Sequence, residues 1–286
     1  MIRKVHKWIT ALPKVAVAGA MLAASVNVQA IDIYAVTEGG ILARFDSATP
    51  GTVPQLGLIT GLGAGESVVG LDFRPSNGRL YALSKDAADA GRLYSVDRTT
   101  GAATLAATLA ADPADVDNPY TTLSGTKFGI NFNPVSDRLR VVSSAGMNIR
   151  VNPGTGLVIT DPAINPGTAN VVGVAYINSY AGATSTTLYD SDSSSDSLLI
   201  QNPPNNGTLM TVGAFGVDFT DIAGFDIVTL GADNYAYATL TVGGTVGLYS
   251  INLSTGAASA LGNVGGDLPV IGLAILPDYL FRNGFD

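Results

Sequence analysis

A short glycine-containing pattern recurs five times along the chain and limits what the chain can fold into. Each copy has glycine, an apolar residue, any residue, and then an apolar or aromatic residue. The copies are Gly70-Leu71-Asp72-Phe73, Gly129-Ile130-Asn131-Phe132, Gly173-Val174-Ala175-Tyr176, Gly224-Phe225-Asp226-Ile227 and Gly272-Leu273-Ala274-Ile275. Their first residues are 59, 44, 51 and 48 positions apart, close to the length of one four-stranded propeller blade. The spacing predicts an all-β fold built from repeated units.

The segments between these copies read as further short strands. After the first copy come RPSNG, RLYALS and GRLYSVDRTTG, with Asn-Gly and Thr-Gly at the reversals. Such dipeptides supply the positive φ angles that tight hairpin turns require. No convincing helical periodicity follows the first thirty residues. Each unit therefore offers four short strands.

The two ends of the chain complement each other. The fifth copy starts so near the C-terminus that its unit lacks three strands. Three strand-like segments precede the first copy, at residues 32–36, 41–46 and 55–59. Pairing the last strand with them would close a ring and remove two exposed sheet edges. We predict one β-propeller of five four-stranded blades. A pair of β-sandwiches remains the alternative, and the first spacing of 59 leaves a degenerate sixth blade open.

The first thirty residues have the features of a signal peptide. A basic region precedes the apolar stretch Val15–Val26, and Val28-Gln29-Ala30 supplies the small residues that a signal peptidase needs. Twelve apolar residues are too few to span a bilayer, and no later segment is long enough. We predict cleavage after Ala30, export to the periplasm or the exterior, and no membrane insertion. The propeller domain would then occupy residues 31–276, before a short tail at 277–286.

Removing the signal peptide limits the kinds of catalytic site, metal site and cross-link that the exported chain can form. The one histidine, His6, and the one tryptophan, Trp8, lie within it, and the chain has no cysteine. The exported chain therefore lacks Ser-His-Asp and Cys-His systems, ordinary zinc sites and disulfides. Four of the 15 basic residues also lie there, which leaves 11 against 23 acidic residues and a net charge of about −12. This charge argues against nucleic acid and anionic membranes as partners.

The block GTKFGINFNPVSDRLRVVSSAGMNIRVNPGTG, residues 125–156, resembles the signature of an exported bacterial family known as domain of unknown function 4394. Residues 201–218, QNPPNNGTLMTVGAFGVD, and 221–227, DIAGFDI, are similar to the same family. The resemblance covers nearly the whole exported chain and implies a propeller-like exported domain. It implies no activity. The C-terminal residues 276–286 look like short Phe-Gly-Phe-acidic tails of other exported proteins, which indicates either a sorting signal or a docked strand end.

Three aspartates lie close together in YDSDSSSDS, residues 189–197. Asp190, Asp192 and Asp196 are weak candidates for calcium ligands. A helix-loop-helix calcium loop also needs a central glycine and a terminal glutamate, which this stretch lacks. Aspartate and serine are also typical of turns. The favoured interpretation is a solvated polar reversal between the second and third strands of the unit that begins at Gly173.

The third position of the five copies offers a candidate ligand site. It holds Asp72, Asn131, Ala175, Asp226 and Ala274. If these strands are innermost, Asp72, Asn131 and Asp226 gather near the channel and could bind a cation or polar ligand. The alternative is that each side chain accepts hydrogen bonds from nearby backbone N–H groups. We favour this second role, because buried carboxylates without partners are costly.

A polar block between residues 131 and 150 is the last candidate. Arg138, Arg140 and Arg150 could clamp a carboxylate or phosphate, because guanidinium binds such groups bidentately. The alternative is internal bracing by Asp137 or by an aspartate of a neighbouring blade.

These features favour an exported, non-catalytic binding or scaffold module, with an unknown small-molecule, glycan or protein ligand and no cofactor. The alternative is an Asp-based hydrolase, such as a glycosidase with optional calcium. Glu38 and Glu66 are the only glutamates, and the lack of tryptophan after residue 30 weakens a sugar-cleaving site. An inert domain carried on a sorting tail is the third possibility.

Overall fold

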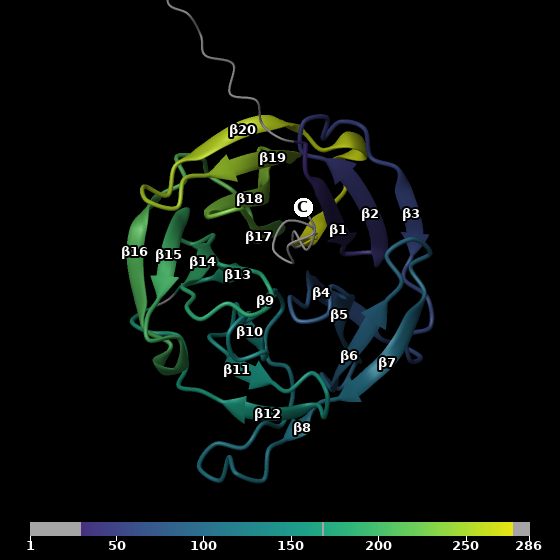
Figure 1. Cartoon of the computed structure of the whole chain (residues 1–286), viewed down its shortest axis with the longest axis vertical. Coiled ribbons are helices and arrows are strands. Elements are labelled where there is room, and N and C mark those ends of the chain that lie inside the picture. The colour runs from purple at the N-terminus through teal and green to yellow at the C-terminus, as the bar shows by residue number, and fades with distance from the viewer. Residues whose placement is uncertain (1–29, 168, 277–286) are drawn as a thin grey trace, which may run out of the picture.

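The computed structural model describes residues 30–167 and 169–276, which form five small sheets in a ring around a central axis (Figure 1). The predicted signal peptide, except Ala30, and the tail at 277–286 lie outside the described residues. The five-bladed propeller is confirmed. The alternatives of paired sandwiches and a sixth blade are wrong. None of the helices in the described segments is long and apolar enough to span a bilayer.

Each blade is an antiparallel sheet that runs from an inner strand at the axis to an outer strand at the rim. Blade 1 comprises β4 (Ser67–Phe73), β5 (Leu80–Lys85), β6 (Gly91–Val96) and β7 (Ala103–Thr108). Blade 2 comprises β9 (Phe128–Phe132), β10 (Leu139–Ser143), β11 (Asn148–Val151), β12 (Leu157–Thr160) and an added outer strand, β8 (Ala110–Ala111). Blade 3 comprises β13 (Val171–Tyr176), β14 (Leu188–Asp192), β15 (Ser197–Gln201) and β16 (Leu209–Ala214).

Blade 4 comprises β17 (Ala223–Leu230), β18 (Asp233–Val242), β19 (Thr245–Ile251) and β20 (Ala258–Asn263). Blade 5 joins the two ends of the chain and comprises β21 (Val270–Ile275), β1 (Asp32–Thr37), β2 (Ile41–Asp46) and β3 (Gln55–Leu58). Two single-turn 3-10 helices, η1 (Pro204–Asn206) and η2 (Gly265–Asp267), lie in connections. The antiparallel register of β1 and β21 pairs Tyr34 with Ala274, so the predicted ring closure is confirmed.

The five glycine-containing copies lie on the five innermost strands, β4, β9, β13, β17 and β21. The long first spacing has a specific cause. It contains β8 and the connection at residues 112–127, the longest between blades, instead of another blade.

Apolar side chains fill the spaces between neighbouring blades, with one buried cluster at each of the five interfaces. The cluster between blades 2 and 3 is the smallest. It consists of Val142, Val171, Val174, Tyr176 and Leu188, with three partly buried neighbours. This interface is also where buried charged side chains gather, as described below.

Backbone hydrogen bonds link neighbouring blades along the outer rim. The segment that leaves each outer strand bonds the turn before the outer strand of the next blade, as in Ala110 N–H to Gly156 O at 3.1 Å. Gly156 has a φ of +76°, and a Cβ there would lie 2.1 Å from the carbonyl oxygen of Thr108. The Thr-Gly reversal predicted from sequence is therefore required both by its turn and by the contact with the preceding blade.

Candidate functional site

The central axis is closed by glycine. A Cβ on Gly129 would lie 2.6 Å from the backbone nitrogen of Val174 in the next blade, so only glycine permits this approach of β9 and β13. The cavity that remains at this level is about 10 Å³. This space holds about one water molecule. The axis is therefore a packed seam and not an open pore.

The three polar residues at the third position of the glycine-containing copies form hydrogen bonds with the neighbouring blades. In each case the side chain accepts a hydrogen bond from the backbone of the next blade. The bonds are Phe132 N to Asp72 Oδ2 at 2.6 Å, Tyr176 N to Asn131 Oδ1 at 2.9 Å, and Ile275 N to Asp226 Oδ2 at 2.6 Å. Asp72, Asn131 and Asp226 thus converge on the axis, at 3%, 1% and 2% exposure, with oxygens engaged by backbone N–H groups.

We call Asp72, Asn131 and Asp226 the polar ring, and burial changes the titration of its two carboxyl groups. Loss of solvent raises the pKa of Asp72 well above its usual value, and the charge of Asp226 raises it further. Loss of solvent also raises the pKa of Asp226 to about 7, although bonds from Ile275, Ile227 and Asn131 oppose the shift. Burial thus disfavours the charged form of both carboxyl groups.

A cavity of about 190 Å³, which we call the mouth cavity, lies at the end of the axis where the inner strands begin. All five blades contribute to its wall. Its floor is apolar, from Val69, Phe128, Val172, Ala223 and Ile271. A groove of about 790 Å³ lies at the opposite end of blade 1, and the described residues that line it belong to that blade, except Leu276.

Charged side chains surround this mouth cavity. Lys127 of blade 2 forms an ion pair with Glu38 of blade 5. Lys85 of blade 1 bonds Gly125 O at 3.0 Å and lies 5.3 Å from the centre of the Phe128 ring. Asp221 of blade 4, half-buried, completes the charged rim. The mouth therefore combines an apolar floor with two ammonium and two carboxylate groups.

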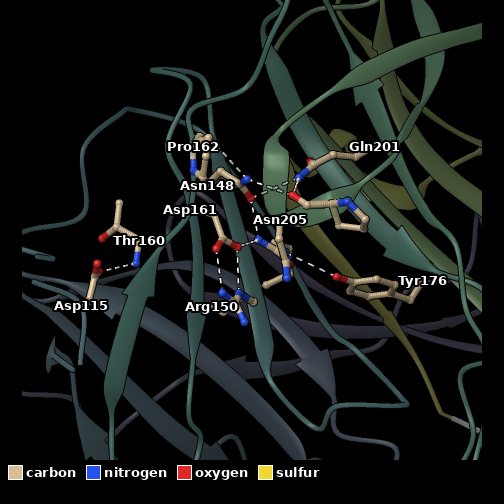
Figure 2. Close-up of polar contacts among 11 residues, drawn as sticks. Asp115, Asn148, Arg150, Thr160, Asp161, Pro162, Tyr176, Gln201 and Asn205 are labelled. Carbon is tan, nitrogen blue, oxygen red and sulfur yellow. Dashed lines mark hydrogen bonds and ion pairs between the residues drawn. The ribbon is translucent and has the colours of Figure 1, made fainter. Parts of the chain in front are cut away.

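The polar block contains a buried ion network at the interface of blades 2 and 3 (Figure 2). Arg140, only 2% exposed, donates to Asp161 Oδ2 at 2.6 Å, and Arg150 bonds both Asp161 oxygens at 2.8 and 2.7 Å. The other Arg140 acceptors are Asn148 Oδ1 at 2.7 Å, Asn205 Oδ1 at 2.6 Å and the Tyr176 hydroxyl at 3.4 Å. The network thus supplies the cohesion that the small apolar cluster at this interface does not.

Two arginines of the predicted clamp, Arg140 and Arg150, therefore meet on Asp161. Arg138 does not join them, because it lies near Asp137. Burial is the largest single influence on the pKa of Asp137 and raises it, but Arg74 and Arg138 help to bring this pKa below its ordinary value. Asp137 also forms an ion pair with Arg74 of blade 1. Asp161 of the same blade thus engages the guanidinium groups of Arg140 and Arg150, and Arg140 also reaches Asn205 and Tyr176 of blade 3.

The aspartate-rich stretch forms the predicted reversal between β14 and β15, with the turn at residues 193–196. The prediction that it is solvated is wrong for Asp190 and Asp192, which are 0% and 4% exposed because they belong to β14. Asp192 accepts bonds from Asn170, Ser194 and Ser195, and Asp196 from Phe219 N at 3.1 Å. The described residues include no cluster of three His, Cys, Asp or Glu side chains able to hold a metal ion.

Asp190 is unusual among these acids. Neither of its carboxyl oxygens has a hydrogen-bond partner among the described residues. Burial raises its pKa well above the ordinary value, partly opposed by the nearby charge of Arg140 and increased by that of Asp192. This side chain is therefore a buried, titratable group at the polar interface.

The chain resembles known proteins in family and in fold. The family model described as domain of unknown function (DUF4394) matches residues 41–274. The chain belongs to the DUF4394 family. No curated protein matches this DUF4394 chain.

Solved structures resemble the DUF4394 fold at low sequence identity. A chain from a nidogen/laminin complex is 12% identical, with a TM-score of 0.50, and the match covers 86% of this chain and 98% of that one. A putative 6-phosphogluconolactonase from Bacteroides uniformis is 15% identical, with a TM-score of 0.43 and 82% of each chain covered. TolB from Acinetobacter baumannii is 11% identical, with a TM-score of 0.42, covering 87% of this chain and 67% of that one. At such identities the likeness concerns the fold alone.

Sequence reasoning missed Asp161 in the DUF4394 domain, although it bonds two of the three proposed clamp arginines. The signal was present in the hairpin register. β11 and β12 pair Ile149 with Thr160, and Asp161 N bonds Asn148 O at 2.9 Å. Because side chains alternate along a strand, this register places Asp161 diagonally from Arg150 on the same face. Asn205 and Gln201 carried no comparable signal, since they belong to the next blade.

Proposed function

We propose that this chain is an exported, non-catalytic binding module that takes a small anionic molecule in the mouth cavity at one end of its axis. The observation that carries the proposal is the mouth cavity, about 190 Å³, to which all five blades contribute. Lys85, paired with Asp89, and Lys127, paired with Glu38, place two ammonium groups beside an apolar floor. A ligand with a carboxylate and an apolar part matches both features.

The state of the polar ring favours binding over hydrolysis. A carboxylate-dependent hydrolase needs an acid and a base that reach the substrate. Asp72 and Asp226 are almost wholly buried and accept backbone hydrogen bonds. Their geometry suits bracing of the inner strands, so the hydrolase alternative lacks an accessible pair at the axis. The proposal includes no cofactor.

Export also belongs to the proposal. Ala30 is exposed, whereas Ile31 is 8% exposed and bonds Ser47 through both its N–H and its C=O. Cleavage after Ala30 would leave this first buried residue as the new N-terminus. Sequencing of the protein recovered from the periplasm or medium is expected to begin at Ile31.

The experiment is titration of the exported chain with a panel of small mono- and dicarboxylates, read by ligand-observed NMR. We expect at least one to bind, and Lys85→Met with Lys127→Met to abolish the signal. Arg79→Met is the matched control, because Arg79 is an exposed cation at the opposite end of blade 1. Binding that survives the double lysine change, or no binding across the panel, would contradict the proposal. Turnover of chromogenic esters or glycosides that Asp72→Asn and Asp226→Asn abolish would support the hydrolase instead.

A further inference from the structure

The connection at residues 112–127 is the most distinctive irregularity of the ring. Figure 1 shows it projecting beyond the rim beside β8. The other connections between blades, at residues 59–66, 161–170, 215–222 and 264–269, are shorter. Long connections without secondary structure in a compact domain are usually functional or disordered.

This connection is fixed at two points. Asp115 Oδ2 accepts a bond from Thr160 N at 2.7 Å, which ties it to the end of β12 (Figure 2). Leu123 is fully buried in the cluster between blades 1 and 2, and its N–H bonds Asp89 O at 2.9 Å. The residues between these anchors are mostly exposed. They form an arch that is held in place at both ends.

A cavity of about 290 Å³ lies under this arch, against the turn between β10 and β11 and the residues after β12. Hydroxyl and amide groups dominate its polar lining, from Asn118, Thr121, Thr122, Ser124 and Thr160. Tyr120, Met147 and Ile149 add apolar surface. No lysine, arginine or glutamate lines it, in contrast to the charged mouth cavity.

Among the described residues, Asp161 is the one charged residue in this lining, and two arginines engage its carboxylate. Arg140 and Arg150 hold it by three bonds, two to Oδ2 and one to Oδ1. Because a carboxylate oxygen accepts two bonds, Oδ1 keeps a free acceptor position in a fixed orientation. The lining thus offers neutral hydroxyl and amide groups beside a carboxylate that is already engaged.

We propose that this arch cavity, defined by residues 118–124, 145–149 and 160–163, binds a neutral saccharide. A sugar presents many hydroxyl groups that both donate and accept, and its C–H faces suit a partly apolar wall. The one carboxylate of the wall is already engaged by two arginines, so neutral hydroxyl and amide groups remain to contact a ligand. The site is independent of the mouth cavity and of the proposed anionic ligand.

The experiment is isothermal titration of the exported chain with maltotriose, cellotriose and chitotriose as probes. We expect at least one probe to bind, and the double variant Asn118→Ala with Thr121→Ala to weaken it at least ~10-fold. Both residues are exposed, so the fold should tolerate the change, as circular dichroism and thermal melting would verify. A second variant, Ala145→Trp, fills the cavity from its exposed wall and should also remove binding.

Lys127→Met is the control that separates the two sites. It should leave saccharide binding unchanged while weakening carboxylate binding at the mouth. The inference is overturned if none of the three probes binds, or if binding survives both arch variants. It is also overturned if Lys127→Met removes saccharide binding, because the sugar would then occupy the mouth.

Discussion

Asn131 on blade 2 donates a hydrogen bond from Nδ2 to Oδ1 of Asp226 on blade 4, at 3.0 Å, across the axis of the propeller. Blade 3 lies between these two blades in the ring, and Asn131 also accepts a bond from its Tyr176 N–H at 2.9 Å. One buried amide therefore ties three blades together. This arrangement explains why the polar positions of the inner strands serve the closure of the ring.

Asn131→Ala should lower the free energy of unfolding by about 1–3 kcal/mol, because it leaves buried partners without hydrogen bonds. The Tyr176 N–H loses its acceptor, and Asp226 loses a donor. Urea denaturation measures the change. Asn118→Ala, at an exposed asparagine, is the matched control and should change stability by no more than about 0.5 kcal/mol. Equal effects of the two variants would contradict the bracing role.

The pH dependence of stability should be unusual for so acidic a chain. Burial raises the pKa of Asp226 to about 7 and raises those of Asp72 and Asp190 above their ordinary values. Between the unfolded and folded pKa values, the folded state binds more protons than the unfolded state. The free energy of unfolding should therefore fall as pH rises from about 4 to about 7. Urea midpoints across this range measure it, and a midpoint that rises with pH would refute the expectation.

Asp190→Asn should stabilise the protein at neutral pH, because burial raises the pKa of this carboxyl group and so penalises its charged form. The change removes a buried carboxyl group that has no hydrogen-bond partner among the described residues. It should also make the free energy of unfolding fall less steeply as pH rises. Thermal melts at acidic and neutral pH would check both effects. Destabilisation of similar size at both pH values would show that Asp190 has a stabilising role.

Asp161→Asn should destabilise the protein by about 3–5 kcal/mol, because it leaves the buried charge of Arg140 without its carboxylate. The double variant Asp161→Leu with Arg140→Met should lose less than the sum of its single changes, since it removes the buried charges together. A double-mutant cycle by chemical denaturation measures this coupling. Additive effects would mean that Arg140 and Asp161 do not stabilise each other.

Added calcium should leave the melting temperature unchanged. In the aspartate-rich stretch, Asp192 and Asp196 already accept bonds from nearby serine hydroxyls and backbone N–H groups. A bound cation would stabilise the folded state and raise the melting temperature in proportion to its occupancy. Melts with EDTA and with calcium would detect it, and a clear rise with calcium would reinstate the metal site.

The candidate site was only partly predictable from sequence. The convergence of Asp72, Asn131 and Asp226 followed from their shared place in the glycine-containing copies. Their partners did not, because the bonds join one blade to the backbone of the next. The two cavities were also beyond sequence reasoning, since each is enclosed by residues from segments that are distant along the chain.

The sequence by itself indicated the repeat, the ring closure and the hairpin reversals, because the glycine-containing copies recur at similar spacing and turn chemistry is local. It left a sixth blade open, which the structure excludes. Only the tertiary structure decided that Asp190 is buried and that Arg140 bonds Asn205 and Tyr176 of the next blade. Burial and polar contacts at a blade interface depend on which faces of two separate sheets meet. Local sequence patterns carry no record of that contact, and the packing of the whole ring establishes it.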